Sequence, residues 1–433
     1  MSSWRKWFAP GIRIKRWLFV GALGLTCFSI GLLLAADSVA LRARNLIGFT
    51  PVQDFLGGSL MTLGFLTGLW ALRQFYLTLS SAVSWNPRKQ LVEVLYDRRY
   101  LDQGLKLVSI GGGTGLSTLL RGLKNYTSNL TAVVAVSDDG GSSGKLRQEL
   151  GILAPGDVRN CLVALADDES LLKELFRYRF AEGGLEGHSF GNLFLAALTD
   201  LAGDFEVAIR LSSQILAVRG TVLPATLSPV NLQARYSDGS VVTGESLIPK
   251  HSESTRIERI TLEPAEVEPP PQVVEAIEQA DAIILGPGSL YTSVIPNLLV
   301  PEIAAAVRRS KAPKIYVCNV MTQPGETDQM GAADHVQTLL AHANIGLDYV
   351  LVNLGDPEKL AEKYRAEGAL PVDPQLDRLA ALGVEGVGTS LICETDWVRH
   401  DPEKLARTIV DLVARHRGKE QLQRSTARLR VVK

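Results

Sequence analysis

The chain has 433 residues, enough to bury a sizeable core and to form more than one structural unit. Its formal net charge is −1, so the composition does not favour a nucleic-acid partner. The four cysteines are scattered and form no C-x-x-C pair, which argues against a zinc site or a disulfide framework and suits a reducing compartment.

Two apolar runs stand near the start of the chain, at residues 17–36 and 55–74. A helix of about 20 residues is roughly 30 Å long, which is the thickness of the hydrocarbon core of a bilayer. Glycines at positions 57, 58, 64 and 68 give the second run a small-residue face suited to close helix packing. We predict a two-helix transmembrane hairpin within residues 1–80; the alternatives are buried soluble helices and, for the first run, a cleaved signal peptide.

Basic residues flank the hairpin unevenly. Five precede the first run and three follow the second, whereas only two lie between the runs. The positive-inside rule therefore places both termini and the main domain in the cytoplasm. Residues 81–105 are interpreted as an amphipathic connector. The basic residues before, after and between the runs are Arg5, Lys6, Arg13, Lys15 and Arg16; Arg73, Arg88 and Lys89; and Arg42 and Arg44.

The stretch KLVSIGGGTGLSTLLR, residues 106–121, has the pattern of a buried strand, a glycine turn and a helix. This arrangement directs free backbone N–H groups and the positive end of a helix at an anion. Leu116 stands where the dinucleotide fingerprint needs its last glycine, and the stretch is not a Walker A loop. We predict a phosphate-binding loop; the alternative is a tight turn without a ligand.

A second glycine-rich turn, SDDGGSSGK, follows the predicted strand 132–136. In open α/β sheets, ligands bind outside the carboxyl ends of the strands, so two such turns on consecutive strands favour a phosphate site. Asp138 and Asp139 could hold Mg²⁺, meet ribose hydroxyls or a base edge, or cap a turn.

The stretch GHSFGN, residues 187–192, leads into an apolar helix. His188 is a candidate general base, and a loop histidine bonded to backbone is the alternative. Asn192 lies at the start of the predicted helix, where it could cap the helix or contact a ligand.

Residues 219–265 change to alternating β patterns and predict a small antiparallel insert of four strands, near 221–226, 230–236, 240–246 and 256–262. The α/β pattern then resumes with strands at 281–285, 314–320 and 349–353, the first followed by a turn with Gly288 and Ser289. We predict a doubly wound, Rossmann-like parallel sheet over residues 106–412. Residues 413–433 are predicted to form a disordered basic tail, either solvated or touching anionic lipid.

Seven motifs together resemble the gluconeogenesis factor family, whose fold is similar to that of 2-phospho-L-lactate transferase. The resemblance covers about residues 106–412. It implies a protein that binds UDP-sugars such as UDP-N-acetylglucosamine and serves peptidoglycan precursor allocation and cell shape. The motifs are GGGTGLSTLLRGLK, SDDGGSSGKLR, PGDVRNCLVAL, GHSFGNLFLAAL, GPGSLYTSVIPNL, VCNVMTQPGETD and DWVRHD.

The resemblance also implies site residues. Thr114 and the glycine loop would meet the diphosphate, and Tyr364 and Arg399 would hold the nucleotide. A tyrosine ring can stack on uracil, and a guanidinium can clamp a phosphate or a base carbonyl, although Arg399 could instead form a surface ion pair. The expected ligand-binding residues are Gly111, Gly112, Gly113, Thr114, Gly115, Asp138, Asp139, Gly141, Ser142, Ser143, Asn192, Gly288, Ser289, Tyr364 and Arg399.

These features and the resemblance lead to two candidate functions, one of a binding protein and one of an enzyme. The first is a sensor in the bacterial inner (plasma) membrane that binds a UDP-sugar without a cofactor and relays its presence to a cell-wall or signalling protein. The second is a transferase of a nucleotide-activated phosphoryl group, with Asp138 and Asp139 holding Mg²⁺. No catalytic residue is firmly placed, which favours the sensor. A second copy of the chain is a further candidate partner.

Overall fold

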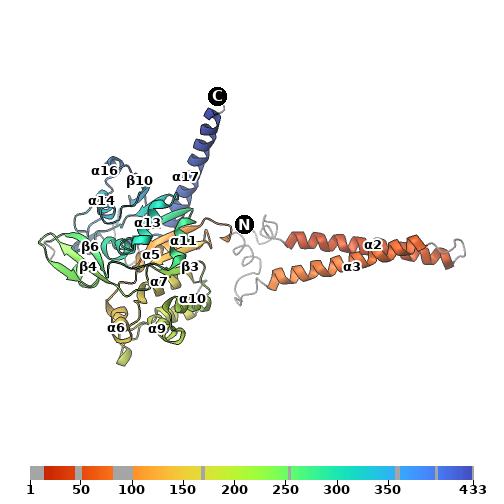
Figure 1. The fold of residues 1–433 in the computed structure, drawn as a ribbon, viewed down its shortest axis with the longest axis horizontal. Coiled ribbons are helices and arrows are strands. Elements are labelled where there is room, and N and C mark those ends of the chain that lie inside the picture. Colours follow the sequence, from red (N-terminus) through yellow and green to blue (C-terminus); the bar gives the residue numbers. More distant parts are fainter. Residues whose placement is uncertain are drawn as a thin grey trace. The chain divides into compact units, whose positions relative to one another are not determined.

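The computed structural model describes residues 14–43, 51–80, 101–166, 171–251, 255–355, 361–394 and 398–431 (Figure 1). The chain divides into two units, Met1–Asp102 and Gln103–Lys433. Most of the predicted connector, residues 81–100, lies outside the described residues.

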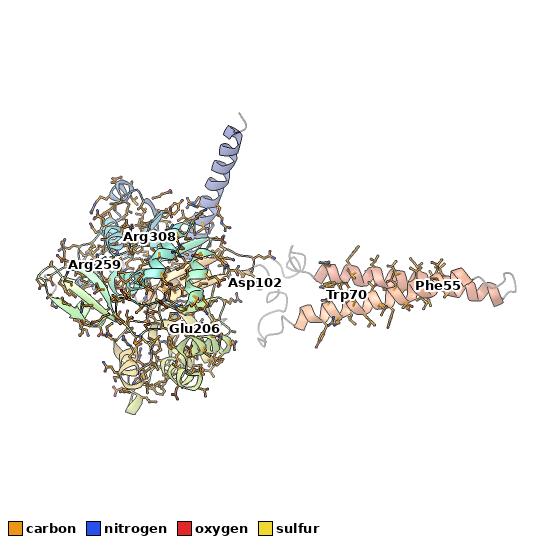
Figure 2. All side chains as sticks on the ribbon, viewed as in Figure 1. Phe55, Trp70, Asp102, Glu206, Arg259 and Arg308 are labelled. Carbon is orange, nitrogen blue, oxygen red and sulfur yellow. The ribbon has the colours of Figure 1, made fainter. Side chains whose placement is uncertain are left out.

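The first unit is a pair of packed helices, α2 (Ile14–Ala43) and α3 (Pro51–Ser80). The stretches Arg16–Ala36 and Phe55–Tyr76 are long and apolar enough to cross a membrane. Large apolar side chains of both helices are exposed, as expected for surfaces that face lipid; Figure 2 labels Phe55 and Trp70 on α3.

Glycines bring the two helices together. A Cβ added at Gly64 would lie 2.5 Å from the backbone nitrogen of Phe28, and one at Gly31 would lie 2.7 Å from the carbonyl oxygen of Gly57. Side chains at these positions would force the backbones apart, so the small-residue face predicted from the sequence is used within the hairpin.

The second unit is built on a seven-stranded parallel sheet with the order β10-β9-β8-β7-β1-β2-β3. The inner strands are continuous apolar runs because helices cover both faces of such a sheet, and the predicted doubly wound fold is confirmed. The strands are β1 (Leu107–Gly111), β2 (Leu130–Val134), β3 (Thr221–Pro224), β7 (Ala282–Leu285), β8 (Lys314–Val317), β9 (Tyr349–Asn353) and β10 (Glu385–Thr389).

The helices that matter most for the site follow β1 and β2. α5 (Gly113–Leu123) packs against α7 (Gly156–Leu165) and α17 (Pro402–Val431). A Cβ at Gly122 would lie 1.9 Å from the carbonyl oxygen of Pro402, so α5 and α17 are in backbone contact. The other helices are α6 (Gly141–Leu150), α8 (Leu171–Arg177), α9 (Phe190–Ala202), α10 (Phe205–Ile215), α11 (Pro271–Glu278), α12 (Ile295–Leu298), α13 (Pro301–Arg309), α14 (Ala332–His342), α15 (Ala361–Ala366) and α16 (Leu376–Ala381).

The insert is a three-stranded antiparallel sheet of β4 (Asn231–Tyr236), β5 (Val241–Thr243) and β6 (Ile257–Glu263), in the order β5-β4-β6 (Figure 1). The prediction of four strands is wrong in one respect. The first of them is β3, which pairs in parallel with β2 at the edge of the main sheet. Its last three residues are all buried, so it lacks the in-and-out alternation of a strand with one solvated face.

Two further elements lie near the carboxyl end of the chain. β11 (Ile392–Glu394) and β12 (Val398–His400) form an antiparallel pair. α17 then continues to Val431, so a helix takes the place of the disordered tail expected after residue 413.

Candidate functional site

The sheet has its switch point between β1 and β7. From β1 the chain proceeds outward to β2 and β3, and from β7 it proceeds in the opposite direction to β8, β9 and β10. The loops that leave these two neighbouring strands diverge, and such a point opens a crevice in doubly wound folds.

A cavity of about 700 Å³ lies at this point, within the usual size range of small-molecule sites. The loops that follow β1 and β7 line it, together with residues from the insert, from the segment after β8, from α15 and from β12. The lining residues are Gly112, Gly113, Thr114, Gly115, Thr118, Glu245, Ser246, Pro249, Pro287, Gly288, Ser289, Thr292, Ser293, Asn319, Val320, Met321, Thr322, Gln323, Pro324, Glu326, Tyr364, Glu367, Ala369, Arg399 and His400.

The loop after β1 needs its glycines for two reasons. Gly113 has φ +65°, a conformation that side chains disfavour, and it is the first residue of α5. A Cβ at Gly115 would lie 2.5 Å from the carbonyl oxygen of Pro287, so only glycine lets the two loops approach this closely. The amino end of α5 consequently opens into the cavity. Its N-cap residue, Gly112, has no capping side chain, Asp157 accepts from the amide of Gly113, and the helix dipole favours an anion there.

Two hydroxyl side chains of the loop after β7 lie close to a buried carboxyl group of the segment after β8. The Ser289 hydroxyl donates a short hydrogen bond to the carboxylate of Glu326, and Thr292 Oγ1 lies 2.7 Å from Ser289 Oγ. Burial raises the pKa of Glu326 to about 7, against the opposing effect of the Ser289 and Thr292 hydroxyls. Glu326 is thus poised to exchange a proton near neutral pH on the cavity wall.

Tyr364 and Arg399 approach the cavity from the carboxyl-terminal part of the chain. The Tyr364 ring packs against the buried residues Val320, Met321 and Ile392, which hold it at the rim. Arg399 is exposed and lies on β12. The structure therefore brings together eight of the predicted ligand-binding residues: Gly112, Gly113, Thr114, Gly115, Gly288, Ser289, Tyr364 and Arg399.

The other predicted residues do not line the cavity. Gly111 ends the buried strand β1. Asp138 accepts from the amide of Gly140 at 2.9 Å, and Asp139 accepts from the amide of Ser246 at 2.8 Å. Asp138 thus makes a turn-capping bond, and Asp139 ties the turn to the insert. Gly141, Ser142, Ser143 and Asn192 lie in the first turns of α6 and α9, also outside the cavity lining.

Ser142, His188 and Asn192 form a buried polar network. Ser142 Oγ lies 3.1 Å from His188 Nδ1 and accepts from Asn192 Nδ2 at 3.1 Å. The cap of α9 is Ser189, whose hydroxyl accepts from the amide of Asn192. Asn192 is therefore not the cap, and neither His188 nor Asn192 is in contact with the cavity.

Carboxylates gather between the two glycine turns. Asp157 accepts a hydrogen bond from the amide of Gly113, which lowers its pKa, but burial and the neighbouring Asp138 raise that pKa to about 6. Burial, followed by Asp138 and Asp157, raises the pKa of Glu245 well above its ordinary range.

Asp138 and Asp139 each accept a hydrogen bond from a backbone amide through one carboxylate oxygen. Within the described residues no group of three histidine, cysteine, aspartate or glutamate side chains could hold a metal ion.

Sequence reasoning missed the polar residues that the insert and the segment after β8 contribute, among them Glu245, Ser246, Asn319, Gln323 and Glu326. Three of them belong to the motif VCNVMTQPGETD, which begins within the predicted strand 314–320 and continues into the turn after it. The position of these polar residues at the end of a predicted strand was the signal that could have identified them. Glu245 and Ser246 lie in the insert, and no pattern in the sequence indicated that this part would reach the cavity.

The fold and the cavity define a Rossmann-like α/β protein with a phosphate-type glycine loop at the switch point of its sheet. Residues 107–392 match the family described as 2-phospho-L-lactate transferase CofD. The chain belongs to this family, as the motifs predicted.

Some relatives match only the second unit of the chain in extent, and others match nearly its whole length. The gluconeogenesis factor of Bacillus subtilis is 50% identical over 317 residues, which cover 72% of this chain and 99% of that protein. A relative from Nostoc is 46% identical over 424 residues, or 95% of this chain and 92% of its own length. A crystal structure of a UPF0052 family member from Bacillus halodurans has a TM-score of 0.68 and 48% identity, covering 71% of this chain and 99% of that one.

Proposed function

We propose that the second unit binds a nucleoside diphosphate sugar, of the UDP-N-acetylglucosamine type, in the cavity between β1 and β7. In this proposal the protein is a regulator of cell shape and of peptidoglycan precursor allocation, and a partner protein at the membrane reads the bound state. The observation that carries it is the amino end of α5, which opens between two glycine loops into a cavity of nucleotide size.

The parts of such a ligand match different walls. The diphosphate would accept from the amides at the start of α5, where the helix dipole favours negative charge. Uracil would stack on Tyr364, and Arg399 would clamp a phosphate or a base carbonyl. Asn319, Gln323 and Glu326 offer hydrogen bonds to sugar hydroxyls.

The charge of the cavity wall favours binding over phosphoryl transfer. Among the described residues that line the cavity, Arg399 is the only lysine or arginine. Phosphoryl transfer depends on several cations that neutralise the developing charge. A transferase remains the second candidate because the family is described by that activity.

Calorimetry on the full chain in detergent tests the proposal. UDP-N-acetylglucosamine should bind one per chain with the same affinity in the presence and absence of Mg²⁺, and the recovered ligand should be chemically unchanged. GDP-mannose and ATP serve as controls for the base and for the sugar. An absence of UDP-sugar binding contradicts the proposal, and consumption of the nucleotide in the presence of an acceptor establishes the transferase instead.

A further inference from the structure

His400 is a buried histidine on the wall of the cavity. It is the last residue of β12 and is 8% exposed. Its ring donates a hydrogen bond to the backbone carbonyl of Cys318, the residue after β8. Among the described residues, the Nε2 atom of His400 has no hydrogen-bond partner. The proton that bonds to Cys318 is therefore assigned to Nδ1, and Nε2 keeps its lone pair.

The charge state of the ring makes Nε2 an acceptor. Burial lowers the pKa of His400 to about 4, against the opposing effect of the bond to Cys318, so the ring is neutral at pH 7. A neutral imidazole with its proton on Nδ1 can only accept at Nε2.

The cavity is the place from which a donor can come. Other buried side-chain atoms in the described part of the chain also lack a partner, but His400 is the residue among them that lines the cavity. Nε2 is covered from water, so a bond to a ligand needs a small rotation of the ring, of the kind that side chains commonly make on binding. A ligand donor would satisfy this acceptor.

His400 lies beside the proposed position of the base. In the antiparallel pair of β11 and β12, His400 is directly opposite Ile392, and residues paired in this way place their side chains on the same face. Ile392 belongs to the small apolar cluster on which the Tyr364 ring packs. His400 and Tyr364 therefore adjoin the same isoleucine, and one supplies an acceptor where the other supplies a ring face.

Arg399 faces the other way. Successive residues of a strand point to opposite faces, so Arg399 leaves β12 on the side away from His400. Burial lowers the pKa of Arg121 on α5, and repulsion from Arg177 and Arg399 lowers it further, so Arg399 is near α5. The amino end of α5 is the proposed position of the diphosphate. The strand thus directs Arg399 toward the phosphates and His400 toward the base.

We propose that His400 selects the base of the nucleotide, because its Nε2 atom accepts the N3–H group of uracil while the Tyr364 ring covers the base. The assignment rests on the proposed function, since it concerns the nucleotide bound in that cavity. N3–H is the hydrogen-bond donor on the edge of uracil, whereas N3 of cytosine carries no hydrogen and presents a lone pair. With cytosine, Nε2 would stay buried opposite a second acceptor, which is costly. The chain should therefore prefer uridine to cytidine nucleotides of the same size.

Calorimetry with UDP and CDP on the full chain in detergent tests the assignment. The wild type should bind UDP more tightly than CDP by about tenfold or more. His400→Phe retains a flat ring but has no acceptor, so it should bind the two nucleotides with nearly equal affinity. A change in packing alone would weaken both nucleotides alike, and the ratio of the two affinities would not move.

His335→Phe is the matched control. His335 on α14 is also a buried histidine whose pKa burial lowers to about 4 and whose Nε2 has no partner among the described residues, but it is not part of the cavity lining. This variant should keep the preference of the wild type for UDP. An unchanged preference in His400→Phe, or an equal loss of preference in His335→Phe, overturns the assignment.

A modified nucleotide tests the same bond without a substitution in the protein. N3-methyl-UDP has no N3–H group, and the wild type should bind it more weakly than UDP by about tenfold or more. Equal affinity for the two overturns the assignment. If UDP binds but the wild type does not distinguish it from CDP, the role of His400 is overturned and the proposed function stands. If no uridine nucleotide binds, the proposed function fails, and the role of His400 fails with it.

Discussion

Tyr364 and Arg399 reach the cavity from α15 and β12, far along the chain from the glycine loop after β1. If the ring stacks on a base and the guanidinium clamps a phosphate, truncation removes contacts that the bound state requires. We expect Tyr364→Ala and Arg399→Ala each to weaken UDP-sugar binding more than tenfold, or about 1.4 kcal/mol, by calorimetry. The exposed neighbour Arg365→Ala is the control. Unchanged affinity in both cavity variants would refute the assignment of the two residues.

Glu326 gives the stability of the domain a pH dependence. Its pKa is raised from 4.5 to about 7 in the folded state, chiefly by burial, so the folded chain binds this proton more tightly than the unfolded chain does. The stabilisation is therefore complete below about pH 4.5 and is lost as the pH rises through 7, by at most about 3 kcal/mol.

The variant Glu326→Gln isolates this effect, because glutamine is neutral at every pH and can still accept from Ser289. We expect its thermal midpoint to match the wild type at pH 5 and to exceed it at pH 8. Asp157 also has a raised pKa, but Glu326 is not among its causes, so it cancels in the comparison. The Glu326 charge is one of the causes that raise the pKa of Glu245, and its removal also favours the variant at high pH. Exposed Glu302→Gln is the control, and a constant difference between pH 5 and 8 would contradict the prediction.

At the scale of elements, the glycine loop after β1 is held in place by its contact with the loop after β7. In Gly115→Ala the new Cβ would meet the backbone oxygen of Pro287 at 2.5 Å, and backbone cannot move aside as a flexible side chain would. We expect a destabilisation of about 1–3 kcal/mol and a tenfold or greater loss of UDP-sugar affinity. Gly184→Ala, whose Cβ would meet nothing within 4 Å, should leave both unchanged. Equal behaviour of the two variants would show that the contact is dispensable.

The membrane hairpin offers a similar matched pair. Gly64 touches the backbone of α2, whereas a Cβ at Gly68 would have nothing within 4 Å. A Cβ at Gly21 would lie 3.7 Å from the Cβ of Ala71, a separation that suits a disulfide, so cysteines at these two positions should cross-link when the helices are packed. In that background Gly64→Leu should slow the cross-linking and Gly68→Leu should not. Equal rates would mean that the close glycine contact does not hold α2 and α3 together.

At the scale of the whole molecule, local patterns predicted the sheet, and eight of the fifteen expected ligand-binding residues line the cavity. The strands at 107–110 and 349–353 were predicted closely because short apolar runs end in glycine or asparagine turns. The strand near 221 was assigned to the insert because periodicity cannot tell which sheet a short strand joins. Glu326 and Glu245 were missed because an acidic loop residue normally faces solvent, and only tertiary packing buries these two.

The orientation of the hairpin decides on which side of the bilayer the cavity lies. Arg16 and Arg73 adjoin the two apolar stretches, and Trp17 packs on Trp70, so both basic flanks are at one end of the hairpin. From the positive-inside rule we predict that this end lies in the cytoplasm. Because a charged diphosphate does not cross the hydrocarbon core, the cavity would then meet the cytoplasmic pool of nucleotide. A C-terminal tag should resist protease in right-side-out vesicles and be cut in inverted ones, while a tag between the two helices behaves in the opposite way. Digestion of the C-terminal tag in sealed right-side-out vesicles would reverse the topology and separate the cavity from that pool.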